Sequence, residues 1–122
     1  MLVAKNKGRL MSKLDDKVAL YTKSANDLGL GLDEDFIAKV AKGLGPSIYN
    51  KDAETVSCSD SSETDRVKSN FLIKKLGLED SDELDAAIKE VCEKMGSSNR
   101  NKYRVLFYAL LAKKFNKESI YA

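Results

Sequence analysis

The sequence predicts an all-α protein, a compact bundle of five main helices with one or two short ones. In five segments apolar residues recur every three or four positions, and no segment alternates as a strand would. Glycines stand just after these periodic segments, where helices commonly end. The segment 105–112 is apolar nearly all round, which is typical of a helix at the centre of a bundle or shared with another subunit. We expect it at the centre.

The first two helices are predicted from the N-terminal third of the chain. One face of the first helix, expected over Ser12–Leu28, carries Leu14, Val18, Tyr21, Ala25 and Leu28. Gly29 ends this helix. The second helix follows Asp33, whose carboxylate suits an N-cap, and stops at Gly43 and Gly45.

The stretch KGLGPSIYN, residues 42–50, holds the only proline of the chain. Proline suits the first position of a helical turn because its φ is already fixed and its missing N–H would be unpaired there. We therefore expect a corner between helices at Pro46, with a short helix whose Ile48 and Tyr49 point into the core. Residues 51–62 are polar and predict a surface connection with one helical turn near Ala53–Val56.

Three further helices are predicted in the C-terminal half. The first begins near Asp60 and runs to Gly77, the second runs from about Ser81 to Gly96, and the third begins near Ser98. Their inward residues are Val67, Phe71, Leu72 and Leu76, then Leu84, Ile88, Val91 and Met95, then Tyr103, Leu106, Phe107, Leu110, Leu111 and Phe115.

The tripeptide LGL occurs at 28–30 and again at 76–78, and each copy closes one helix and leads through acidic residues to another. Glycine adopts the left-handed cap that other residues resist. Two interpretations stand side by side. Either the chain consists of two related helix-LGL-helix halves, or a common capping motif arose twice without duplication.

The length fits a single domain over residues 12–122. Met11 stands directly before the helical pattern, so we expect residues 1–11 to be a loosely ordered extension, either from an upstream start or from cloning. Its apolar run is too short for a signal peptide, and no segment has the length and apolar character of a membrane helix. We expect no membrane association and a cytoplasmic location.

The residue types argue against several kinds of chemistry. The chain has no histidine, which removes the commonest general base and metal ligand. Cys58 and Cys92 are too few for a disulfide scaffold and lack a metal spacing, so we expect two plain thiols. The acidic runs at 33–35 and 79–85 lack the pattern of a calcium loop, and the glycine-rich stretches lack the ending of a P-loop. We expect no catalytic residue, metal or cofactor, and the sequence favours a protein that is not an enzyme.

The charges are unevenly distributed along the chain. Residues 52–96 hold six basic and twelve acidic residues, whereas residues 97–122 hold six basic residues and one acidic residue. The basic residues of SSNRNKYR fall where we expect the last helix to begin, the end at which the helix dipole disfavours positive charge. An offsetting partner is either internal, in the region 79–93, or an external phosphate or carboxylate; plain solvation is the third alternative. The candidate anion-binding residues are Ser97, Ser98, Asn99, Arg100, Lys102 and Arg104.

Two functions follow as hypotheses. The first is a non-enzymatic protein-interaction module, whose partner is another protein or a second copy, suggested by the apolar last helix. The alternative is a binder of a phosphate-bearing ligand or nucleic acid through the basic start of that helix. A net charge of +2 is modest for a nucleic-acid binder.

Three blocks, KGLGPSIYN, VKSNFLIKKLGL and NRNKYRVLFYALLAKKF, together resemble a family of small bacterial proteins known only as a domain of unknown function. The resemblance covers Met11 to about Phe115. It implies a compact helical domain in a bacterial cytoplasm and supports Met11 as the natural start. It implies no catalytic or binding residue.

Overall fold

Helices form all the main elements of the part of the chain that the structure describes, residues 12–96 and 98–121 of a computed structural model. The expected loose segment 1–11 and the candidate residue Ser97 lie outside these described residues. The main helices are α2 (Ser12–Leu28), α3 (Glu34–Leu44), α5 (Ser61–Arg66) continued by the π-helix η2 (Val67–Lys75), α6 (Asp82–Lys94) and α7 (Arg104–Lys114). The short ones are η1 (Gly45–Tyr49), α4 (Lys51–Glu54) and η3 (Glu118–Tyr121).

The predicted fold class is confirmed. With α5 and η2 taken as one rod, the described residues contain five main helices and no strand. Two of the predicted helix starts are also confirmed, because the Asp33 carboxylate accepts a hydrogen bond from the backbone N–H of Phe36, and Asp60 caps α5 in the same way through Ser62. No helix within the described ranges combines the length and apolar character needed to cross a bilayer.

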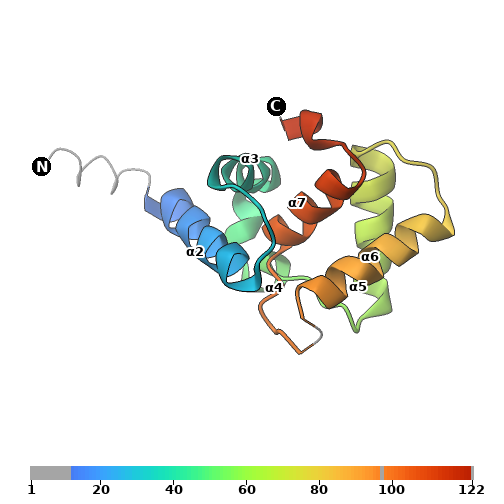
Figure 1. The fold of residues 1–122 in the computed structure, drawn as a ribbon, viewed down its shortest axis with the longest axis horizontal. Helices are drawn as coiled ribbons and strands as arrows, with labels where there is room; N and C mark the ends of the chain where they lie inside the picture. Colours follow the sequence, from blue (N-terminus) through green and yellow to red (C-terminus); the bar gives the residue numbers. More distant parts are fainter. Residues whose placement is uncertain (1–11, 97, 122) are drawn as a thin grey trace, which may run out of the picture.

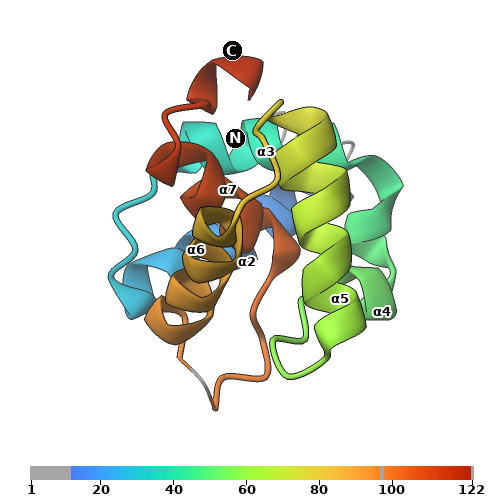
Figure 2. The same ribbon diagram turned by 90° about the vertical axis from the view of Figure 1, so that its right-hand side faces the viewer.

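The helix α7 lies at the centre of the molecule, as its sequence predicts. Every residue from Val105 to Ala112 is buried. Helices α2 and α3 pack on one side of it and α6 on the other, with the α5–η2 rod beside α6 (Figure 1). The same arrangement is visible in a view turned by 90° (Figure 2). The helices on both sides thus share one core, which is built around α7. No apolar face of α7 is left uncovered.

The two LGL sequences end their helices with the same backbone device. Gly29 has φ +66° and Gly77 has φ +72°, the left-handed conformation that only glycine adopts without strain. After α2, the N–H of Leu30 donates to the carbonyl of Ala25, and after η2 the N–H of Leu78 donates to that of Leu72. The second bond spans one residue more because η2 is a wider π-helix. The capping motif explains this likeness by itself, so duplication stays a hypothesis.

The corner at residues 42–50 follows the prediction at Ile48 and departs from it at Tyr49. Ile48 is 2% exposed and belongs to the core, whereas Tyr49 is 45% exposed. The prediction that Tyr49 points inward is therefore wrong. Successive side chains of a 3₁₀-helix point about 120° apart, so both cannot face the same core.

The last main helix begins later than predicted, at Arg104 instead of near Ser98. Asn99 holds the chain in a turn, because its side-chain amide donates to the carbonyl of Met95 and its side-chain oxygen accepts from the N–H of Asn101. Lys102 and Tyr103 are then extended and pair with a distant loop. Residues 98–102 are therefore a loop, and they offer no free helix N-terminus.

Candidate functional site

Two loops far apart in the sequence meet below the N-terminal end of α7. The N–H of Val56 donates to the carbonyl of Lys102 at 2.9 Å, and Thr55 forms an antiparallel bridge with Tyr103. The loop after α4 and the loop after α6 consequently lie side by side (Figure 2). Between them is a hollow of about 450 Å³, lined by residues 55–59 and by Ser98, Asn99, Arg100 and Lys102. We call this hollow the loop pocket.

The loop pocket brings together four of the six predicted anion-binding residues, Ser98, Asn99, Arg100 and Lys102. Sequence reasoning missed the opposite wall, formed by residues 55–59, which contributes further hydroxyl groups. The only hint of it in the sequence is the serine-rich composition of that polar connection.

The charges that line the loop pocket are all positive. Arg100 is exposed, whereas Lys102 is buried, with 6% of the residue exposed, and its ammonium donates to the carbonyl of Asn99 at 2.6 Å. No carboxylate is among the lining residues of the pocket. Asp60, which follows this wall in the sequence, accepts from the N–H and hydroxyl of Ser62, and these bonds hold the pKa of Asp60 below its usual value. The Asp60 carboxylate is thus bonded to the start of α5.

Arg104 does not lie in the loop pocket. Its guanidinium donates to the backbone carbonyls of Ala53 and Thr55 and to the Tyr108 hydroxyl, and forms an ion pair with Glu63. Burial acts to lower the pKa of Arg104, but Tyr108 and Glu63 outweigh it and the pKa is raised. The internal carboxylate weighed from the sequence therefore exists for Arg104, and it is Glu63 instead of a residue in 79–93. We call this group of side chains the Arg104 cluster.

Cys58 and Cys92 form a disulfide, so the prediction of two plain thiols is wrong. Cys58 lies in the wall of the loop pocket and Cys92 lies on α6. They are 34 positions apart in the sequence, and local spacing cannot show which distant segments pack together. The described residues contain no group of three or more His, Cys, Asp or Glu that could hold a metal ion.

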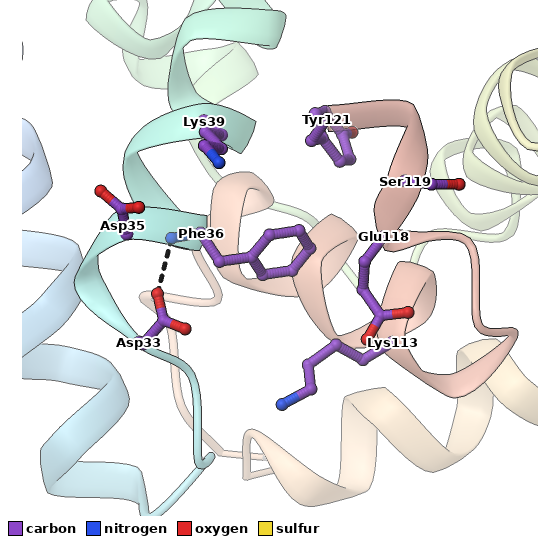
Figure 3. A pocket seen from close by; sticks show the side chains of 8 residues that line it. All are labelled: Asp33, Asp35, Phe36, Lys39, Lys113, Glu118, Ser119 and Tyr121. Atoms are coloured by element: carbon purple, nitrogen blue, oxygen red, sulfur yellow. Dashed lines mark hydrogen bonds between the residues drawn. The ribbon is translucent and has the colours of Figure 1, made fainter.

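A second hollow of about 380 Å³ lies between α3, η3 and the end of α7 (Figure 3). The Phe36 ring projects into it, and Tyr121 packs edge-on against that ring with 5.9 Å between centroids. Burial raises the pKa of Tyr121. Both signs of charge surround this hollow: Asp33, Asp35 and Glu118, with Lys39 and Lys113. A ligand of single charge is therefore favoured less here than in the loop pocket.

The fold and the loop pocket define a small helical domain with an electropositive hollow at one end of its central helix. The chain belongs to the family described as "Protein of unknown function (DUF2853)", whose model matches residues 17–119. This confirms the resemblance seen in the three sequence blocks. No curated protein matches the chain.

Proposed function

We propose that this protein binds a small ligand bearing a phosphate or carboxylate group in the loop pocket. The observation that supports this most is the composition of the pocket lining, which holds Arg100, Lys102 and several serine and threonine residues but no Asp or Glu. An anion entering the pocket would meet donors on both walls and no charge of its own sign.

Arg100 would supply the principal contact. It is exposed at the edge of the pocket, and a guanidinium offers two parallel N–H groups to a phosphate or carboxylate. Hydroxyl groups of Ser57, Ser59 and Ser98 would complete the coordination, with Lys102 adding positive potential from below. This proposal omits Arg104, because Glu63 already pairs with it. The proposed site is formed by two loops, whereas the sequence predicts a site at a helix N-terminus.

The size of the pocket favours a small ligand over a nucleic acid. A volume of about 450 Å³ is within the range of small-molecule sites. Nucleic-acid binding depends on a basic face that neutralises several phosphates, and the net charge of this chain is only +2.

The test is calorimetric titration with inorganic phosphate and with a small phosphomonoester at low salt. Arg100→Ala should weaken binding about ten- to a hundredfold, since a hydrogen-bonded charged contact contributes about 1.5–3 kcal/mol. Arg66→Ala is the matched control, because Arg66 is an exposed arginine outside the loop pocket. Binding that is indifferent to both Arg100→Ala and added salt would refute the proposal.

A second candidate function, protein interaction, is favoured by the exposed Tyr49. Its ring borders a hollow of about 270 Å³ with Lys13, Asp16 and Lys17 of α2, and the exposed Leu20 follows one turn further along α2. Tyr49 and Leu20 would each contribute exposed apolar area to a contact surface. The apolar α7 supports this candidate no longer, since it is internal. Light scattering of the wild type and of Leu20→Ser with Tyr49→Ser tests self-association, and a monomer at all concentrations would remove that version.

A further inference from the structure

The Cys58–Cys92 disulfide borders two surface hollows. Cys58 lines both the loop pocket and a smaller hollow of about 220 Å³, whereas Cys92 lines only the smaller one. Both side chains are partly exposed and lie at the edge of the hydrophobic core. Cys58 thus borders the same pocket that gathers positive charge.

The loop that carries Cys58 is also held by contacts independent of the disulfide. Before Cys58, the N–H of Val56 bonds to Lys102, and the carbonyl of Thr55 accepts from Arg104. After it, Asp60 caps α5. Cleavage of the disulfide would therefore leave Cys58 near Cys92, a condition for re-forming the bond.

We propose that the ligand of the loop pocket is an anionic thiol, a small molecule with both a thiol and a carboxylate or phosphate group, and that it exchanges with the Cys58–Cys92 disulfide. This inference rests on the proposed function, because Arg100 and the hydroxyl groups of the pocket hold the anionic group. The thiol is then placed beside Cys58. The pocket increases the rate by holding the reactants together.

The exchange takes two steps. The thiolate of the ligand forms a bond to Cys58 Sγ while the Cys58–Cys92 bond breaks, and the bonding electron pair leaves with Cys92 Sγ as a thiolate. A second thiolate attacks the ligand sulfur of the mixed disulfide and releases Cys58 as a thiolate. Two ligand thiols are oxidised to one disulfide, and the two cysteine thiolates take up the two protons that the ligands lost.

The smaller hollow is suited to the departing Cys92 thiolate. Lys89 lines it, and a nearby ammonium favours the thiolate form. Asp85 lines it too, but its carboxylate is paired with Lys68 at 2.9 Å. Attack from the loop pocket falls on Cys58 because Cys92 does not line that pocket.

The experiment measures the rate at which the oxidised full chain is reduced by mercaptosuccinate, which carries two carboxylates, and by uncharged 2-mercaptoethanol. Free thiols are trapped by alkylation and counted by mass, and rates are compared per thiolate. Mercaptosuccinate should react at least about tenfold faster at low salt, the lower end of the ratio expected for one charged hydrogen-bonded contact. Arg100→Ala, or salt at about 1 M, should bring the two rates together, whereas Arg66→Ala should not. Inorganic phosphate should slow mercaptosuccinate alone.

The outcomes separate this inference from the proposed function. Equal rates per thiolate for the two thiols, in a protein that binds phosphate through Arg100, would overturn the inference and leave the proposed function standing. Absence of both phosphate binding and thiol preference would overturn both. A wild-type chain in which diamide forms no Cys58–Cys92 bond would also overturn the inference.

Discussion

The Arg104 cluster and the loop pocket adjoin each other at the start of α7, yet they use positive charge in opposite ways. Arg104 and Glu63 are each only 14% exposed in their side chains, and the guanidinium is surrounded by protein acceptors. Arg100 is exposed at a hollow without carboxylates. The cluster is a structural joint between α5 and α7, while Arg100 is accessible to solvent at the pocket. Two arginines four positions apart thus have different roles because of what the distant chain brings to each.

The largest loss of stability should come from a substitution in the Arg104 cluster. Arg104→Ala removes the main partner of the Glu63 carboxylate and leaves only the exposed Arg66 at 3.3 Å, so the loss should approach but not exceed that of a broken buried pair, about 3–5 kcal/mol. Urea denaturation followed by circular dichroism measures the loss. The double variant Glu63→Leu, Arg104→Met should lose less than the single variant, since no charge stays buried. A loss under about 1 kcal/mol for Arg104→Ala would show that the cluster contributes little to stability.

Removing the disulfide tests how firmly the wall of the loop pocket is held. Cys58→Ser with Cys92→Ser should lower the free energy of unfolding by about 2–4 kcal/mol, because the cross-link restricts the unfolded chain. The folded loop keeps its bonds to Lys102 and Arg104, so anion affinity should change little. The same calorimetric titration checks this. A complete loss of affinity in a folded variant would mean that the disulfide shapes the pocket.

Alkaline pH tests a second internal contact, the hydrogen bond that the hydroxyl of the buried Tyr21 donates to Glu54 at 2.5 Å. Burial, reinforced by that bond, raises the pKa of Tyr21. The unfolded chain releases the phenolic proton near pH 10 and the folded chain keeps it, so stability should fall as pH rises above about 10. The slope is about 1.4 kcal/mol per pH unit for this tyrosine. Denaturation between pH 8 and 11 measures it, and a slope unchanged in Tyr21→Phe would contradict the assignment.

The smallest loss of stability should come from a substitution in the loop pocket. Arg100→Ala removes an exposed side chain, and such surface changes usually alter the free energy of unfolding by less than about 0.5 kcal/mol. Urea denaturation beside Arg104→Ala gives the comparison directly. A loss for Arg100→Ala similar to that for Arg104→Ala would abolish the distinction between the two sites.

The sequence predicts the fold because each helix carries its own signals. The spacing of Val18, Tyr21 and Ala25 gives the inward face of α2, and Gly29 gives its end. The long apolar run gives the central position of α7. Such signals are local, so they can be recognised without knowing which other segments pack against the helix.

The site was predicted only in part because its remaining features are pairings across the chain. Four candidates do line one pocket, but the start of α7 is moved by the pairing of Lys102 with Val56, and Glu63 removes Arg104 from the candidates. The disulfide joins a loop to a helix without any spacing rule. The π-helical turns of η2 carry no proline or glycine that would mark them.

The central position of α7 also bears on how the protein is made. The ribosome synthesises α2, α3, the α5–η2 rod and α6 before α7, the helix that contacts all of them. Helices with an uncovered apolar face gain little stability, so the nascent chain should stay open, and available to chaperones, until Arg104–Lys114 has left the exit tunnel. We therefore expect folding to be completed after translation of this segment, in one late cooperative step.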